Sequence, residues 1–248
     1  MTDPDALLDR VRVVLVETSH PGNVGSAARA LKTMGLSRLV LAAPRCALDD
    51  SARAMASGAD DVLAGAVRSA GLEDAVGDCV LVVAASARPR EIGPPSTDAR
   101  TAALDLAAAA RRGPVALVFG NETSGLSNQH LRRCDAVAHI PANPAYSSLN
   151  LAAAVQVFCY EVRMAVDRAI PPPAGDVDVP ATRGEVEALL AHAERALGEL
   201  GFYDPANPKR LLPRLRRLAA RARLEREEVN ILRGVLGWVE RRGDGTAR

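Results

Sequence analysis

The amino-acid sequence predicts an α/β protein built on a mostly parallel β-sheet. Short runs of aliphatic residues recur along the first 140 residues, and helical stretches separate them. Strands that are apolar throughout are typical of parallel sheets with both faces covered by helices. The alternation of strand and helix favours the same architecture. A Pro-rich segment and a charged helical region follow.

Five strands and four helices are predicted before the Pro-rich segment. The strands are residues 11–16, 38–41, 79–84, 115–119 and 136–140. The helices are residues 26–34, 98–112, 126–134 and 149–169, the last of them apolar over most of its first turns.

The Pro-rich segment, residues 170–184, reads IPPPAGDVDVPATRG and predicts a linker. An amphipathic helix over residues 185–200, a turn-rich joint and two further helices within residues 209–242 are expected beyond it. We therefore predict a catalytic domain over residues 1–169, a linker over 170–184 and a helical carboxyl-terminal extension over 185–248.

The amino-acid composition excludes several classes of protein. Apolar residues make up 48% of the chain, enough for an ordinary core, and aromatic residues only 3%. Stacking of bases on exposed rings is therefore not expected to be the main mode of recognition. The four cysteines lie far apart and the four histidines lack metal-ligand spacing, so we expect reduced thiols and no metal. No apolar run reaches the ~18 residues of a membrane span, so a cytoplasmic protein with no membrane contact is expected.

The near-neutral net charge of +1 hides an uneven distribution. Residues 209–248 carry twelve Lys or Arg and five Asp or Glu, whereas the rest of the chain is net acidic. Arg214, Arg217 and Arg221 recur on one face of a predicted helix, and Leu211, Leu215 and Leu218 are expected to form a separate apolar stripe. This pattern predicts an extension that binds a polyanion; the alternative is a solvated helix surface.

The first motif, ETSHPGNVGSAARALKTMG, directly follows the first strand. Gly22 and Gly25 are expected to allow a tight turn before the helix, whose amino terminus favours a phosphate or carboxylate. The alternative is a turn that needs glycine only to connect strand and helix. Arg29 is placed in the first turn of this expected helix, where the helix dipole disfavours a cation, so its position indicates a ligand.

Two further polar loops follow strands at the edge of the sheet where α/β proteins bind small molecules. GNETSGLS begins at Gly120, and its free backbone groups are suited to reading a purine edge. NPAYSSLN precedes the long apolar helix, and Ser147 or Ser148 is predicted to cap that helix.

Together the three motifs resemble those of the SPOUT-class RNA ribose methyltransferases, the TrmH/SpoU superfamily. PKRLLPRLRRLAARAR (208–223) and EVNILRG (228–234) resemble the carboxyl end of its TrmJ subfamily. The resemblance implies a trefoil-knot fold, a homodimer and S-adenosyl-L-methionine as cofactor. It also implies 2′-O-methylation of tRNA, most specifically of cytidine or uridine 32 in the anticodon loop.

The resemblance also assigns roles to individual residues. The implied catalytic residues are Arg29, Asn23, Glu122, Ser148 and Asn150. The implied cofactor-binding residues are Ala85, Ser86, Ala87, Gly120, Ile140, Ser147, Ser148 and Leu149. The residues expected to contact RNA are Arg88, Arg90, Arg214, Arg217 and Arg221.

Arginine stays protonated, so an electrostatic role is easier for Arg29 than a role as base. His20, next to the first motif, is an alternative base. Three other functions remain open: ribose methylation at another tRNA or rRNA site, an inactive RNA-binding relative, and a nucleotide-binding metabolic enzyme. The basic extension disfavours the last of these, and the retained catalytic residues disfavour the second.

Overall fold

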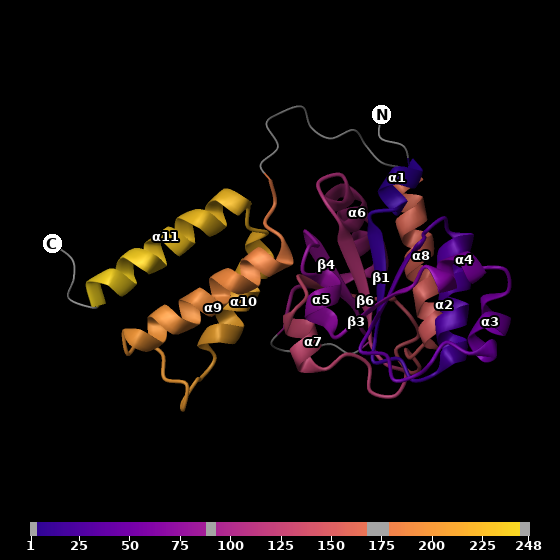
Figure 1. Cartoon of the computed structure of the whole chain (residues 1–248), viewed down its shortest axis with the longest axis horizontal. Helices are drawn as coiled ribbons and strands as arrows, with labels where there is room; N and C mark the ends of the chain where they lie inside the picture. The colour runs from indigo at the N-terminus through magenta and orange to yellow at the C-terminus, as the bar shows by residue number, and fades with distance from the viewer. Residues whose placement is uncertain (1–3, 88–92, 168–178, 244–248) are drawn as a thin grey trace.

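The computed structural model describes residues 4–87, 93–167 and 179–243. Figure 1 shows an α/β part on the right and three helices on the left. The α/β part contains a seven-stranded sheet in the order β3-β2-β1-β6-β4-β7-β5, and all its strand pairs are parallel. The strands are β1 Val11–Val16, β2 Arg38–Ala42, β3 Val67–Ser69, β4 Leu81–Ala85, β5 Ser96–Asp98, β6 Val115–Phe119 and β7 Ala136–His139.

The predicted fold class and the five predicted strands are confirmed. The sequence did not reveal β3 and β5, which are three residues long and lie at the two edges of the sheet. Neither contains an apolar run that would have marked it as a strand. The trefoil knot implied by the resemblance stays a prediction.

Helices cover both faces of the sheet. They are α1 Pro4–Leu8, α2 Pro21–Thr33, α3 Asp50–Ala56, α4 Asp60–Ala64, α5 Leu72–Val76, α6 Ala99–Ala110, α7 Asn128–Arg132 and α8 Leu151–Asp167. Val13 and Leu15 of β1 join a buried cluster with residues of α2, α6 and α8, whereas Val14 and Val16 face α5 and α7. This alternation follows from the two-residue period of a strand. It explains why every residue of the central strand β6 is buried.

The start of α2 differs from the prediction. The helix begins at Pro21, with His20 at the N-cap position, so Gly22 and Gly25 lie inside it rather than in a turn. A Cβ atom on Gly25 would lie 1.9 Å from the backbone oxygen of Ala52, so glycine permits the close packing of α2 on α3. Arg29 therefore lies well beyond the first turn, and the prediction based on the helix dipole was wrong.

The cap of α8 also differs from the prediction. The helix begins at Leu151, and the Oδ1 atom of Asn150 accepts a hydrogen bond of 2.9 Å from the backbone N–H of Ala152. Asn150, rather than Ser147 or Ser148, therefore satisfies a free donor of the first turn. Ser147 and Ser148 lie in the loop before α8 and do not cap the helix.

Helices α9 Arg183–Glu199, α10 Leu211–Ala222 and α11 Arg226–Gly243 form the tail, as predicted. Its small core contains Val186, Leu189 and Val229, with Leu215 packed against it. Leu218 is 58% exposed, so the expected apolar stripe was wrong at that position. Of the predicted linker, residues 170–178 lie outside the described part, and the end near Gly184 overlaps the start of α9.

Candidate active site

A cavity of about 420 Å³ opens at the carboxyl ends of β4, β6 and β7. All the predicted cofactor residues line it: Ala85, Ser86, Ala87, Gly120, Ile140, Ser147, Ser148 and Leu149. Glu122 and Asn150 line it as well. Its size lies within the range of roughly 300–1,000 Å³ that is usual for small-molecule sites. The structure thus gathers three segments that are distant in sequence around one cavity.

The loop after β6 depends on glycine at position 120. A Cβ atom there would lie 2.2 Å from the backbone carbon of Gly125 and 2.3 Å from the nitrogen of Leu126. Asn121 stabilises the turn, because its Oδ1 atom accepts hydrogen bonds from the N–H groups of Thr123 (3.0 Å) and Ser124 (2.8 Å). The backbone therefore folds back tightly on Gly120 and shapes the wall of the cavity.

Glu122 connects this loop to the first motif. Its Oε1 atom accepts a hydrogen bond of 3.0 Å from Asn23 Nδ2, and its Oε2 atom accepts one from Ser19 Oγ at 3.1 Å. Asn23 Oδ1 in turn accepts a hydrogen bond of 3.2 Å from Asn150 Nδ2. A continuous polar chain thus links the three motifs beside the cavity.

The environment of Glu122 favours the ionised carboxylate. Burial acts to raise its pKa, but the hydrogen bonds from Asn23 and Ser19 outweigh burial and hold the pKa below its usual value. Glu122 is therefore negatively charged at neutral pH and acts as a hydrogen-bond acceptor. Sequence reasoning missed Ser19, because its contact with Glu122 spans more than 100 residues.

Two predicted catalytic residues, Asn23 and Arg29, are absent from the cavity lining, and only Asn23 is hydrogen-bonded to residues that line it. Arg29 is remote from these contacts. Its side chain is exposed on α2 and is absent from the cavity lining. Among the described residues it makes no hydrogen bond or ion pair. Asn23, on the same helix, is in contact with Glu122, so α2 carries one member of the site and directs another outward.

The residues expected to contact RNA fall in two places. Arg88 and Arg90 lie outside the described residues. Arg214, Arg217 and Arg221 are exposed on α10. No ion pair joins these three side chains to any residue that the structure describes. All three side chains are therefore accessible to a polyanion.

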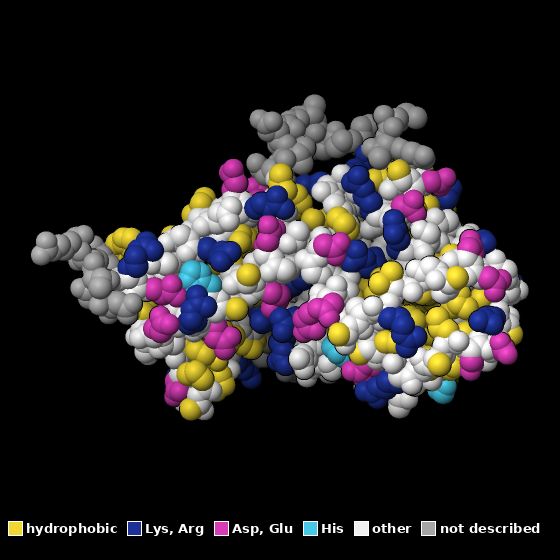
Figure 2. Space-filling model, in the orientation of Figure 1, with side chains coloured by type: hydrophobic (Ala, Val, Ile, Leu, Met, Phe, Trp, Pro, Cys, Tyr) yellow, Lys and Arg dark blue, Asp and Glu magenta, His cyan; other side chains and the backbone are white. Residues whose placement is uncertain are grey.

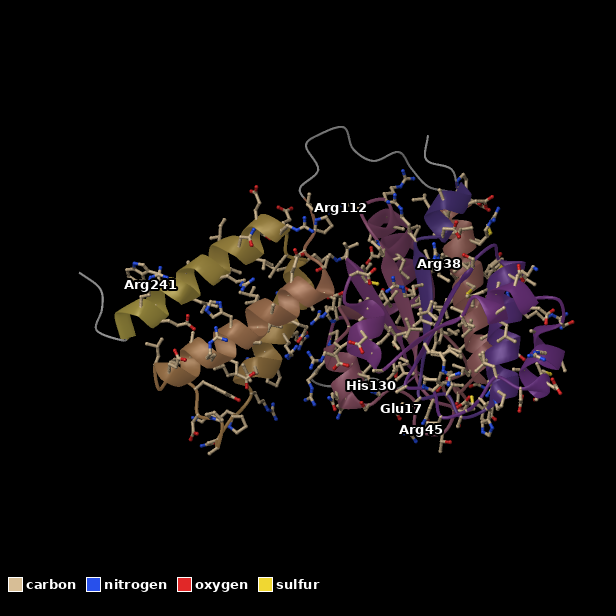
Figure 3. The ribbon with its side chains drawn as sticks, in the orientation of Figure 1. Glu17, Arg38, Arg45, Arg112, His130 and Arg241 are labelled. Carbon is tan, nitrogen blue, oxygen red and sulfur yellow. The ribbon has the colours of Figure 1, made fainter. Side chains whose placement is uncertain are left out.

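The first motif also contacts α7, which the sequence did not predict. Glu17, whose backbone has a left-handed φ of 53°, forms an ion pair with Arg45, and its Oε1 atom lies 3.9 Å from His130 Nε2. Figure 3 shows the three side chains together at the lower edge of the sheet. A non-glycine residue at positive φ gives no signal in the sequence.

The described part of the chain contains neither a metal-binding cluster nor a membrane-spanning helix. No group of three or more His, Cys, Asp or Glu side chains within residues 4–87, 93–167 and 179–243 could hold a metal ion. None of the helices in these ranges is long and apolar enough to cross a membrane.

Comparisons with known proteins agree over nearly the whole chain. The SpoU rRNA Methylase family matches residues 10–160, and the carboxyl-terminal domain of the tRNA methyltransferase TrmJ matches residues 184–248. The tRNA (cytidine/uridine/adenosine-2′-O-)-methyltransferase TrmJ of Pseudomonas aeruginosa is 48% identical over 93% of each chain. The tRNA (cytidine/uridine-2′-O-)-methyltransferase TrmJ of Pectobacterium atrosepticum is 46% identical over 96% of this chain and 100% of its own.

A solved structure extends the agreement to three dimensions. The crystal structure of TrmJ from Z. mobilis ZM4 aligns with a TM-score of 0.80. It is 33% identical, and the alignment covers 92% of this chain and 98% of that one. Family matches, relatives and structure thus coincide, and the chain belongs to the TrmJ branch of the SpoU methylase family.

Proposed function

We propose that this protein uses S-adenosyl-L-methionine to methylate a ribose 2′-hydroxyl of tRNA, at cytidine or uridine 32. The observation that carries the proposal is the polar chain of Glu122, Asn23 and Asn150 beside a cavity lined by every predicted cofactor residue. The TrmJ relatives are named for 2′-O-methylation of tRNA nucleosides, which gives the substrate class. An enzyme acting on tRNA would work in the cytoplasm.

The cavity suits S-adenosyl-L-methionine. Solved methyltransferases that share this fold hold AdoMet. The backbone of the Gly120 loop presents donors and acceptors along one wall, and Ala85 and Ala87 leave room along another. When bound, the cofactor supplies a methyl group activated by its sulfonium.

The residues of the chain would align the ribose and stabilise the charge that develops on its oxygen. Ionised Glu122 holds Asn23 and Ser19 in place, so the first-motif loop is ordered before substrate binds. Arg29 would stabilise the developing alkoxide or bind the neighbouring phosphate, because a guanidinium stays protonated. The phosphate or a solvent molecule would then accept the proton.

The position of Arg29 favours a homodimer. Arg29 is exposed and lies outside the cavity that the chain builds by itself. A second copy packed on this surface would supply Arg29 to its partner's cavity. Light scattering at micromolar concentration should therefore give twice the mass of the chain; a monomer that is fully active would contradict this arrangement.

The direct test is methylation of defined tRNA by the purified protein. A tRNA transcript incubated with S-adenosyl-L-methionine should gain one ribose methyl group, located at nucleotide 32 by mass spectrometry of its fragments. The same transcript with 2′-deoxyribose at position 32 should gain none. A methyl group elsewhere in tRNA, or only in rRNA, would reassign the target. Cofactor binding without any transfer would indicate an inactive RNA-binding relative.

A further inference from the structure

An ionic network joins the tail to the α/β part. It contains three carboxylates and three arginines: Glu73, Asp135 and Glu187 with Arg133, Arg183 and Arg216. Figure 2 shows acidic and basic side chains close together where the two parts meet. Glu187, on α9, is the hub, since all three arginines bind its carboxylate.

The tail docks through backbone contacts as well. The N–H groups of Arg183 and Gly184, in the first turn of α9, donate to the carbonyls of Cys79 (2.8 Å) and Gly77 (2.9 Å). A Cβ atom on Gly184 would lie 3.0 Å from that Gly77 oxygen. The first turn of α9 is therefore fitted closely to the connection between α5 and β4, so the direction of the tail is defined.

The network reaches the segment between two cavity loops. Asp135 accepts hydrogen bonds from Arg183 Nη1 at 2.7 Å and from the backbone N–H of Val82 at 2.8 Å. Arg133 and Asp135 lie between α7, which follows the Gly120 loop, and β7, which leads to Ile140. The tail is thus attached just before the amino end of β7, the strand whose carboxyl end leads to Ile140 in the cavity lining.

Arg216 links the same network to α10. Its Nη1 atom lies 2.6 and 2.5 Å from the two carboxylate oxygens of Glu187. Arg214 and Arg217, its close neighbours on α10, are exposed. The pair therefore fixes which side of α10 lies against α9, and Arg214 and Arg217 remain exposed.

We propose that Glu187 is a positioning residue for tRNA. By binding Arg216, Arg183 and Arg133 together, it holds α10 so that the exposed arginines and the cavity engage one tRNA molecule. This inference rests on the proposed function. A role in stability alone would not couple Glu187 to the exposed arginines of α10.

The test is Glu187→Gln in the full-length protein, with a tRNA transcript and S-adenosyl-L-methionine. The KM for tRNA should rise about tenfold, while kcat and cofactor affinity stay within about twofold of the parent, because the cavity itself is untouched. Replacing Arg214, Arg217 and Arg221 with Gln should weaken tRNA binding less in this background than in the parent. Glu187→Asp, which keeps the charge, should restore part of the affinity.

Glu240→Gln is the matched control. Glu240 also binds two basic side chains, His192 and Arg195, but both lie within the tail. Its replacement should leave the KM for tRNA unchanged. If Glu187→Gln does not fold, Arg133→Gln removes one partner from the α/β side and should raise the KM in the same way.

The opposite results would overturn the proposal. An unchanged KM in Glu187→Gln, or full additivity with the three arginine substitutions, would leave Glu187 with a structural role only. If the parent methylates no tRNA, the proposed function fails. The change in tRNA affinity caused by Glu187→Gln, measured without catalysis, would still decide the role of Glu187.

Discussion

The cavity and the tail present two different solutions to recognition. Around the cavity, shape is set by the backbone: Gly120 lies against Gly125, and hydrogen bonds to Asn121 hold the loop that follows the fully buried β6. The tail has a small core, and Leu218 and Ile231 are 58% and 65% exposed. The recognition surface that we propose for it consists of exposed charged side chains on α10. A small steric change should therefore abolish function at the cavity, whereas removal of charge from the tail should weaken function gradually.

Arg29 tests this comparison most severely, because it is a charged, exposed side chain that we propose acts at the cavity of a second copy of the chain. Arg29→Ala should lower kcat by about 10²–10³, the cost of removing a group that stabilises charge in the transition state. Its affinity for S-adenosyl-L-methionine, measured by calorimetry, should stay within a few-fold of the parent. Normal turnover by the Arg29→Ala enzyme would show that Arg29 has no catalytic role.

Gly120 tests the role of backbone shape. Gly120→Ala should lower cofactor affinity about 100-fold, because even one methyl group would lie within 2.3 Å of the Gly125–Leu126 backbone and displace the loop. Calorimetry measures the affinity, and circular dichroism checks that the fold is retained. Gly201→Ala serves as the control, since its Cβ would meet no atom within 4 Å, although its φ of 69° adds some strain. Normal cofactor binding by Gly120→Ala would show that the cavity wall is not rigid.

The same contrast explains what could be predicted from the sequence. The five apolar strands were readable because burial on both faces leaves a continuous pattern, and the motif loops were readable because each follows such a strand. The start of α2 was not predicted, since the two glycines of PGNVG are typical of a loop. In the structure Pro21 occupies the first helical position, where proline is favoured, and Gly25 packs on Ala52.

Contacts between residues that are distant in the sequence could not be predicted either. Nothing near Glu187 in the sequence indicates that it binds Arg133 and Arg216, which belong to other elements. The same applies to Ser19 and Glu122. Asn150, which the resemblance assigns to the site, lines the cavity, but its capping of α8 is seen only in the structure.

Glu122 tests whether ordering of the loops matters separately from the cofactor. Glu122→Gln should lower kcat/KM about tenfold, since a neutral amide binds Asn23 and Ser19 less strongly than a carboxylate does. Because folding lowers the pKa of Glu122, its ionised form adds stability at neutral pH that is lost as pH falls through the folded-state pKa. The difference in unfolding free energy between parent and Glu122→Gln should therefore shrink as pH falls. A constant difference would mean that the charge is not what stabilises the loops.

Substitutions in the tail are expected to have the smallest effect per residue. Replacing Arg214, Arg217 and Arg221 with Gln should weaken tRNA binding a few-fold at physiological salt and leave cofactor affinity unchanged. Removing one arginine–phosphate interaction should lower the slope of log affinity against log salt by about 0.7–0.9. Arg163→Gln is the control: Arg163 also lies at the surface, but it pairs with Asp167 within α8. If the triple variant keeps the affinity and salt slope of the parent, the charges on α10 serve solubility, and the tail contributes to recognition through another surface.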